Sequence, residues 1–293
     1  MNELFYISKE CGVQNAVFYF FYKVKFKLNQ LLGGPAAKEK QNKRVDKIYE
    51  ALALQQKTKL NKGGKKYAAY SLPGSDYEVW IRPYTSDGKT FEQIFIRNEY
   101  ECVVEIYRQF FPDPAETIID CGANIGLASI WFFLRYPGTS FTVVEPFRES
   151  ADLAEMNFNQ CGLNKYTMLH GGVWNRDTTL MLNRVFRDGK EWSISLEESK
   201  GENRNINGYS LSKIVANIQG NIDILKIDIE GAEKVIFEDE TATDFLHKVK
   251  CIAIEIHDEL FIREKIYSVL KENNFFYYNT GELTIAINRS FNR

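Results

Sequence analysis

The sequence predicts an α/β protein in which helices cover both faces of a mostly parallel sheet, and three observations support this. From residue 117 onward, short apolar runs alternate with helical patterns, which is typical of successive βαβ units. Two further strand-like runs, FFYYNTG and LTIAINRS, lie so close together that we expect them to pair antiparallel as a hairpin. The 293 residues are 44% hydrophobic and 26% charged, which is enough to bury a large core.

The expected elements follow one another along the chain. Apolar runs are expected to form strands, and segments with apolar residues every three or four positions are expected to form helices. Before the hairpin, strands are expected at 117–122, 140–146, 166–173, 222–230 and 250–257, and helices at 127–136, 150–162, 231–239 and 258–274. With the hairpin this gives a seven-stranded sheet with an antiparallel C-terminal strand.

Three regions are expected along the chain. Residues 117–293 form the α/β domain, residues 67–116 form a segment of strands and a helix, and residues 1–66 form a basic helical N-terminal extension. The extension contains 14 lysines and arginines against five acids, whereas the rest of the chain carries a net charge of −11. The two parts are therefore expected to have different roles.

The amphipathic pattern of residues 12–32 has two interpretations. An aromatic and aliphatic side flanked by lysines suits a helix that lies on an anionic membrane surface. Packing on the α/β domain or on a second subunit is preferred, because apolar stripes usually face a core, and a homo-oligomer therefore remains an open alternative. The apolar run at 16–22 is much shorter than the ~20 residues of a spanning helix, and no signal peptide is expected.

Cysteine usage and charge exclude several classes of protein. The five cysteines are widely spaced, and only three histidines are present to join them, so neither a disulfide framework nor a thiolate zinc site is expected. A cytoplasmic setting follows, with contact at the membrane periphery as an option for the N-terminal stretch. No nucleic-acid partner is expected, since the body is acidic and shows no recognition motif.

A glycine-containing turn follows the first strand of the α/β domain. Its G-x-x-x-G spacing, from Gly122 to Gly126, differs from the G-x-G-x-x-G of dinucleotide enzymes, and Asp120 would repel a pyrophosphate. Glu145 at the end of the second strand can accept both hydroxyls of a ribose. These residues together predict an adenosine-containing ligand with a positive end, although the turn alone is equally well explained as an ordinary strand-to-helix connection.

Polar residues also end two later strands. Alternation of side chains in LKIDIEGAE places Lys226, Asp228 and Glu230 on one face, and the next strand brings Glu255 and His257 together. Both sets lie at the carboxyl ends of parallel strands, the rim where open α/β sheets bind ligands. We therefore expect Asp228 and Glu230 to face a crevice rather than the core.

The segments TIIDCGANIG, VVEP, LKIDIEGAE and IEIH, in this order and at these separations, resemble the FkbM family of S-adenosylmethionine-dependent methyltransferases. The upstream segment IRPYTSDGKTFEQIFIRNEYE is similar to the same family, so the resemblance spans residues 78–290. It implies a Rossmann-like methyltransferase fold, S-adenosylmethionine as donor, and O-methylation of a sugar, a glycan or a related small molecule. It also implies donor-binding roles for Asp120, Gly122, Asn124, Gly126, Glu145 and Pro146, and places Lys226, Asp228, Glu230 and His257 near the transferred methyl group.

Methyl transfer to an alcohol requires alignment of donor and acceptor and a base for the hydroxyl proton. His257 is the first candidate for this base and Asp228 the second, because histidine titrates near neutral pH. In structural alternatives, His257 caps the following helix or is simply hydrogen-bonded at the strand end, and Lys226 pairs with a neighbouring carboxylate to hold the loop. A divalent metal ion on Asp228, Glu230, Glu255 and His257 is a less favoured alternative.

Two other functions are compatible with the same fold. An NAD(P)-dependent oxidoreductase is disfavoured by the turn pattern and by Asp120. A non-catalytic module that binds nucleosides would use the fold without turnover. Acceptor contacts are expected from residues 67–111 and 184–209, because such contacts usually come from loops and insertions.

Overall fold

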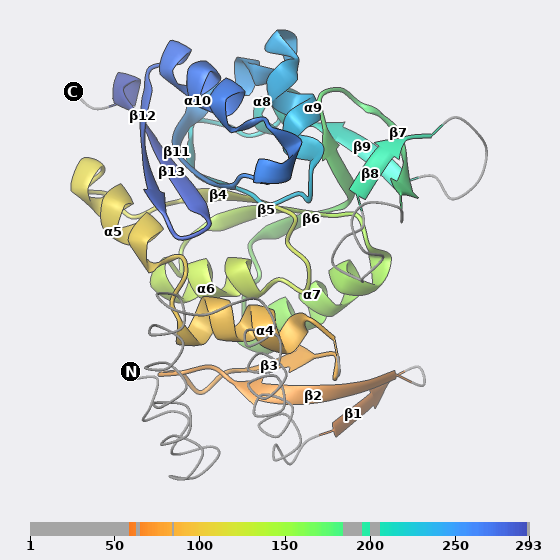
Figure 1. Cartoon of the computed structure of the whole chain (residues 1–293). Helices are drawn as coiled ribbons and strands as arrows, with labels where there is room; N and C mark the ends of the chain where they lie inside the picture. The colour runs from red at the N-terminus through yellow and green to blue at the C-terminus, as the bar shows by residue number, and fades with distance from the viewer. Residues whose placement is uncertain (1–58, 63–64, 84, 184–194, 200–205, 292–293) are drawn as a thin grey trace, which may run out of the picture. The chain divides into compact units, whose positions relative to one another are not determined.

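The computed structural model describes residues 59–62, 65–83, 85–183, 195–199 and 206–291 (Figure 1). The chain divides into two compact units, Met1–Glu99 and Tyr100–Arg293. The helices expected within residues 1–58, including the amphipathic stretch 12–32, lie outside the described residues. None of the helices in the described part of the chain has the length and apolar character that a membrane crossing requires.

The described part of the first unit contains a three-stranded antiparallel sheet in the order β1-β2-β3. Its strands are β1 (Lys59–Lys62), β2 (Lys65–Ser71) and β3 (Glu78–Ile81). Strand β1 and the start of β2 therefore lie within residues 1–66, where a helical extension was expected. Lys62 pairs with Lys65, so two glycines join the strands, and a Gly-Gly pair between two short runs is a hairpin signal.

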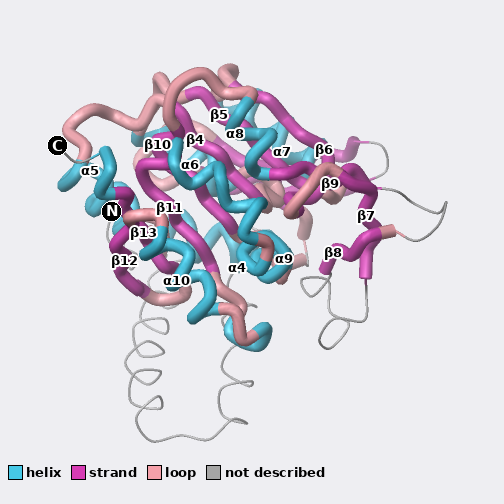
Figure 2. The backbone as a smooth tube through the Cα atoms, turned by 90° about the horizontal axis from the view of Figure 1, so that it is seen from above, coloured by secondary structure: helices cyan, strands magenta, loops and turns pink. Residues whose placement is uncertain are grey.

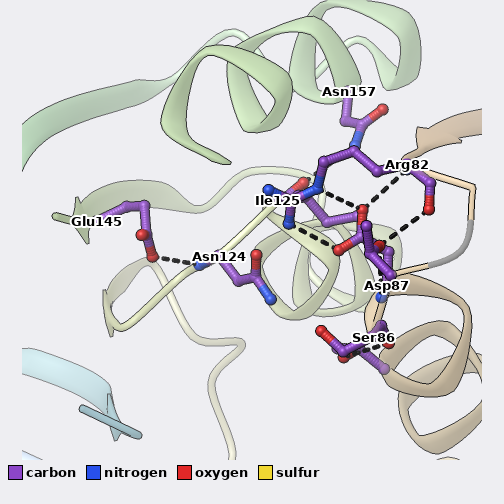
Figure 3. Close-up of polar contacts among 9 residues, drawn as sticks. Arg82, Ser86, Asp87, Asn124, Ile125, Glu145 and Asn157 are labelled. Atoms are coloured by element: carbon purple, nitrogen blue, oxygen red, sulfur yellow. Dashed lines mark hydrogen bonds and ion pairs between the residues drawn. The ribbon is translucent and has the colours of Figure 1, made fainter. Parts of the chain in front are cut away.

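Two short helical segments, α4 (Asp87–Phe91) and the π-helical η1 (Glu92–Ile96), follow β3. Asp87 is fully buried and compensates for this by accepting hydrogen bonds from the Arg82 backbone amide (2.9 Å) and guanidinium (2.8 and 2.7 Å) (Figure 3). A buried carboxylate paired in this bidentate way fixes the end of β3 against the start of α4. Strand β3 lies within residues 67–116, where strands were expected.

The second unit contains a ten-stranded sheet in the order β12-β13-β11-β10-β4-β5-β6-β9-β7-β8. Its strands are β4 (Thr117–Cys121), β5 (Ser140–Glu145), β6 (Tyr166–Trp174), β7 (Thr178–Asn183), β8 (Ser195–Glu198), β9 (Ile206–Ser210), β10 (Ile222–Ile227), β11 (Val249–Glu255), β12 (Phe275–Thr280) and β13 (Leu283–Asn288). The seven expected strands run from β12 to β6 in this order, and among them only β13 runs opposite to the other six. The α/β fold and the C-terminal hairpin are thus confirmed.

Three strands that were not expected, β7, β8 and β9, extend the sheet beyond β6 (Figure 1). Part of the segment 184–209, which was expected to be a loop, therefore forms strands. β8 lies within this segment, and β9 begins in it and ends at Ser210. Gly208 in β9 packs against Leu180 of β7, so a Cβ at this position would lie 3.0 Å from Leu180 Cγ. This polar and glycine-containing stretch lacks the apolar alternation on which the strand predictions relied.

Helices cover both faces of the sheet (Figures 1 and 2). One face carries α6 (Leu127–Arg135) and α7 (Arg148–Cys161), and the other carries α8 (Leu211–Ala216), α9 (Ala232–Glu238) and α10 (Arg263–Glu272). The helix α5 (Glu101–Phe110) packs aromatic rings against α6, with 5.3 Å between the Tyr100 and Phe132 centroids. Two 3₁₀ segments, η2 (Glu240–Lys248) and η3 (Asp258–Leu260), flank β11, and η4 (Arg289–Phe291) follows β13.

The order of the strands creates a topological switch point between β4 and β10. The chain starts in the middle of the sheet at β4, adds β5 and β6 on one side, and then returns to place β10 and β11 on the other side. In open α/β sheets, ligands bind outside the carboxyl ends of the strands at such a point. The loops that leave β4 and β10 are therefore the part of the molecule where a site is expected.

Candidate active site at the carboxyl ends of β4, β10 and β11

The loops that leave β4 and β10 are in direct backbone contact. The Asp228 amide donates a hydrogen bond to the Cys121 carbonyl (3.1 Å), and Gly122 has a φ of 80°. A Cβ at Gly122 would lie 1.7 Å from the Asp228 carbonyl oxygen, so only glycine fits. This close approach brings Asp228 beside the glycine turn.

The glycine turn is also tied to the end of β5. Glu145 is buried, and its carboxylate accepts the Asn124 amide (2.7 Å) (Figure 3). The same carboxylate also accepts the Phe147 amide (2.9 Å). Asn124 has a φ of 50°, which is uncommon outside glycine and occurs at functional sites where surrounding bonds hold it. Glu145 thus fixes the glycine turn by binding the backbone amide of Asn124. Pro146 directly follows Glu145, the last residue of β5.

The second glycine of the turn, Gly126, begins α6. Its φ of 82° and its contact with α7 leave no room for a side chain, because a Cβ would lie 2.5 Å from Phe158 Cε1. The Asn157 side-chain amide donates to the Ile125 carbonyl (3.0 Å), so α7 also holds the turn in place (Figure 3). Glycine is therefore required at position 126 because α7 packs closely against it.

Asp120 and Lys226 form a buried ion pair between β4 and β10. Their side chains are 1% and 3% exposed, and the carboxylate Oδ1 lies 3.1 Å from Nζ. Ser129 donates to Asp120 Oδ2 (2.6 Å), and Lys226 donates to the Gly122 carbonyl (2.9 Å). Burial lowers the pKa of Lys226, but Asp120, Tyr100 and Asp228 outweigh it and raise this pKa well above its ordinary value. Lys226 is therefore a fixed positive charge that holds the two strand ends together.

Asp228 and Glu230 lie on the rim of the sheet and are partly exposed, by 31% and 40% of their side chains. The expectation that they continue the alternation of a strand is wrong, because β10 ends at Ile227. Glu230 has a φ of 49° and precedes Gly231 at 100°, so the chain turns sharply here. Burial is the main cause that raises the pKa of Asp228 above its usual range, aided by Glu230 and opposed by Lys226.

His257 lies between two carboxylates at the exit of β11. Its Nδ1 is 3.1 Å from Glu233 Oε1 and its Nε2 is 3.4 Å from Glu230 Oε2, while the side chain is 6% exposed. Burial lowers the pKa of His257, but the contacts with both glutamates outweigh it and raise this pKa to about 10. His257 makes no side-chain capping bond to η3, so the capping alternative is not supported by the geometry.

Glu233 was not singled out from the sequence, although it is the least exposed acid of this group. It lies in the first turn of α9 and is fully buried, and its Oε2 has no hydrogen-bond partner among the described residues. The sequence holds a signal that could have identified it. Glu233 shares the buried helix face with Ile236 and Phe237 at the i+3 and i+4 positions, where an acid is costly unless it is paired.

The site carries an excess of negative charge. Four carboxylates face two cations in this group of neighbouring side chains, which comprises Asp120, Asp228, Glu230, Glu233, Lys226 and His257. Glu233 Oε2 is buried without a hydrogen-bond partner in the described chain, and Glu230 Oε2 is buried with His257 Nε2 3.4 Å away. Because unpaired buried oxygens favour a nearby positive charge, the residues fit a ligand with a cationic centre such as a sulfonium.

A metal ion also fits the side-chain types at this rim. Asp228, Glu230 and His257 each offer a ligand atom, and these atoms lie within 4.8 Å of one another. Glu255, which was expected to join them, is not part of this group: it is the last residue of β11, paired with Leu283. A metal ion bound there would require His257 Nε2 to be unprotonated.

A surface cavity of about 850 Å³ lies away from this rim. Its lining includes Thr117 and Ser140, the first residues of β4 and β5, together with Arg108 and Lys165. It therefore opens at the amino ends of the strands, the opposite end of the sheet from Asp228 and His257. Mixed charges on exposed side chains give it no arrangement suited to group transfer.

The topology and the charged rim define a Rossmann-like α/β domain with a ligand site at its switch point. Within this class, the sequence matches the Methyltransferase FkbM domain over residues 120–277. The chain belongs to the FkbM family of methyltransferases and is an S-adenosylmethionine-dependent methyltransferase. No curated protein matches its sequence.

Several solved structures resemble the chain at low sequence identity. A precorrin-6y C5,15-methyltransferase from Geobacter metallireducens GS-15 has 11% identity and a TM-score of 0.38, covering 64% of this chain and 86% of its own. An rRNA methylase from Streptococcus thermophilus has 8% identity and a TM-score of 0.39, with 64% and 94% covered. A ribosomal protein L11 methylase from Lactobacillus delbrueckii subsp. bulgaricus has 14% identity and a TM-score of 0.36, with 62% and 73% covered.

Proposed function

We propose that this methyltransferase transfers a methyl group to a hydroxyl of a sugar, a glycan or a related metabolite. The observation that carries the proposal is the partly exposed pair Asp228 and Glu230 beside the glycine turn at the switch point. Carboxylates on this rim suit a cationic donor and also supply a base for an alcohol. The acceptor class is supported by the resemblance of the sequence motifs to the FkbM family.

The donor site proposed here follows the turn from Gly122 to Gly126. The backbone of this turn would line the donor site at Gly122, Asn124 and Gly126. Hydrogen bonds from β5, from the loop after β10 and from α7 hold the turn in its conformation. Glu145 is held by two backbone amides at the end of β5, a position that suits the hydroxyls of a ribose, and Pro146 would restrict the chain beside it. When bound, S-adenosylmethionine supplies an electrophilic methyl group on its sulfonium.

Asp228 is the better candidate for the base that takes the proton of the acceptor. His257 lies between Glu230 and Glu233 with a pKa raised to about 10, so at neutral pH it is an imidazolium that carries a proton on both ring nitrogens. A group that is already protonated cannot accept the acceptor's proton. In this proposal His257 holds Glu230 in place, and the raised pKa of Asp228 makes that carboxylate a better base than an ordinary one.

Lys226 and Asp120 contribute to the proposed reaction indirectly. Both are buried and are bonded to each other, to Ser129 and to the Gly122 carbonyl, so they position the two loops rather than contact the acceptor. Their charges hold the loops after β4 and β10 in position before substrate binds. Such positioning is the main contribution that a protein makes to an in-line displacement.

The first test is a calorimetric titration of the full chain with S-adenosylhomocysteine and, separately, with NADH. We expect binding of S-adenosylhomocysteine and no heat with NADH, because the turn lacks the dinucleotide pattern. A screen of sugar and glycan acceptors with labelled donor, followed by mass spectrometry, then identifies the product. Methylation is expected to continue in EDTA. Binding without turnover of any acceptor would favour the non-catalytic module, and tight NADH binding would overturn the proposal.

A further inference from the structure

The buried carboxylate of Glu233 is the feature of the site that the proposed reaction leaves unexplained. Glu233 is 0% exposed, in the first turn of α9, on a face otherwise formed by apolar side chains. Removing a carboxylate from water costs several kcal/mol unless its partners compensate for it. The partners of Glu233 should therefore reveal why an acid is retained at this position.

One oxygen of Glu233 makes both of its contacts. Oε1 accepts the Ile229 amide (3.3 Å) and lies 3.1 Å from His257 Nδ1. Ile229 belongs to the loop after β10, whereas His257 follows β11. A single buried carboxylate thus connects the exits of two neighbouring strands, the same exits that carry Asp228 and the imidazole.

A purely structural role accounts for only part of this arrangement. An acid in the first turn of a helix stabilises the helix and can bond to backbone amides before it, which explains the contact with Ile229. It does not explain why the acid is buried or why the imidazole of His257 is turned toward it. An exposed acid would serve the helix equally well at a lower cost of desolvation.

The contact with Glu233 decides which nitrogen of His257 is presented to the rim. Because Nδ1 is held by the buried Oε1, Nε2 is directed at Glu230 Oε2, 3.4 Å away. The charged groups that act on the imidazole are Glu233 from the start of α9, Asp228 and Glu230 from the loop after β10, and Asp258 from η3. Glu233 is the only fully buried one among these four.

We infer that Glu233 is a positioning residue of the active site, which holds the His257 imidazole so that its Nε2 faces Glu230 at the rim of the sheet. Its effect on methyl transfer rests on the proposed function, whereas its effect on the imidazole does not. At metal sites, a carboxylate that fixes a histidine from behind contributes about 10- to 100-fold to activity, and we expect an effect of similar size here. Glu233 itself contacts neither donor nor acceptor.

Nuclear magnetic resonance of the histidine side chains tests the inference directly, because the chain contains only three histidines. In the full-length protein, His257 should titrate far above the ordinary range, with both ring nitrogens protonated at neutral pH. Glu233→Gln keeps an oxygen for the Ile229 amide but removes the charge, and it should lower the pKa of His257 by about 1 to 3 units. His247, which is largely exposed, serves as the internal reference.

Kinetics separate positioning from a purely structural role. Glu233→Gln should lower kcat by about 10- to 100-fold and leave the affinity for S-adenosylhomocysteine within about twofold, a change of less than 0.5 kcal/mol. Glu238→Gln, on the same helix but 53% exposed, is the matched control and should change neither quantity. Partial recovery of kcat in Glu233→Asp relative to Glu233→Gln would further support a positioning carboxylate.

Two results would overturn the inference. The first is a His257 ring whose Nδ1 is unprotonated at pH 7 in the unmodified protein, because such a nitrogen cannot donate to Glu233. This measurement needs no variant and so remains decisive if Glu233→Gln does not fold. The second is a folded Glu233→Gln variant in which both the His257 titration and kcat are unchanged. Absence of S-adenosylhomocysteine binding to the unmodified protein would instead reject the proposed function, and the two failures are therefore distinguishable.

Discussion

Individual residues at the exits of β4 and β10 adopt backbone conformations that the surrounding bonds impose. Asn124 and Glu230 have φ values of 50° and 49°, and each lies in the loop just after one of the two central strands. Such conformations cost about 1 to 3 kcal/mol and persist only where other contacts determine them. The paired occurrence on both sides of the switch point indicates that the shape of the rim is fixed before any ligand binds.

At this scale, Gly122→Ala tests how closely the two loops approach. The added Cβ would meet the Asp228 carbonyl oxygen at 1.7 Å, and the φ of 80° is unfavourable for alanine. We expect the loops to separate, with at least a tenfold loss of affinity for S-adenosylhomocysteine in calorimetry. Gly138→Ala is the control, because a Cβ there meets nothing within 4 Å. Equal donor affinity in the two variants would show that the approach of the loops is not needed for binding.

Among the elements, the strands of the sheet have different charged groups at their two ends. Asp223, near the start of β10, accepts the Tyr107 hydroxyl (2.9 Å), the Glu116 and Thr117 amides (2.8 and 3.0 Å) and the Lys250 ammonium (2.7 Å). This network joins α5, β4, β10 and β11 at the amino ends of the strands. The candidate active site lies at the carboxyl ends of the strands. The structural carboxylate of Asp223 and the carboxylates of the site therefore lie at opposite ends of the same sheet.

Asp223→Asn should therefore affect stability without affecting the site. The substitution removes the charge opposite Lys250 and directs an amide group at donors, and hydrogen bonds to a charged group are each worth about 1.5 to 3 kcal/mol. We expect urea unfolding to report a loss of about 2 to 3 kcal/mol, with unchanged affinity for S-adenosylhomocysteine. Asp152→Asn breaks an exposed pair with Arg148 and should cost less than about 1 kcal/mol. A loss of donor affinity in Asp223→Asn would contradict this separation of the two ends.

For the whole molecule, the charged imidazole of His257 couples stability to pH. Its pKa is raised from 6.5 to about 10, so the folded state binds this proton more tightly than the unfolded state does. The stabilisation is fully present below pH 6.5 and is lost as the pH rises toward about 10. The free energy of unfolding should fall over this window with a slope of at most about 1.4 kcal/mol per pH unit.

Urea denaturation at several pH values measures this dependence. The His257→Gln variant provides the comparison, since it lacks the titrating group and should lose this part of the slope. Parallel curves for the variant and the unmodified protein between pH 6.5 and about 10 would contradict a raised pKa. The comparison reports on the free protein, so it needs neither donor nor acceptor.

The sequence by itself determined the parallel core of the sheet, because each buried strand is a short apolar run and each covering helix repeats its apolar residues with its own period. It also indicated the glycine turn after β4 and the acidic residues after β10. The structure places these two loops in contact with each other. The hairpin at residues 59–71 and the strands β7 to β9 were missed. The runs KLNK, SLEE and INGYS are short and mostly polar, and the apolar part of TTLMLN is only three residues long.

Only the tertiary structure decided what these side chains touch. The register of neighbouring strands decides that Lys226 and Asp120 form an ion pair inside the sheet. It also decides that β10 ends at Ile227. The charge state of His257 depends on Glu233, which lies on a helix 24 residues away. Local patterns record which residues are apolar at a given spacing, whereas pKa values and burial depend on groups that the fold brings together from distant parts of the chain.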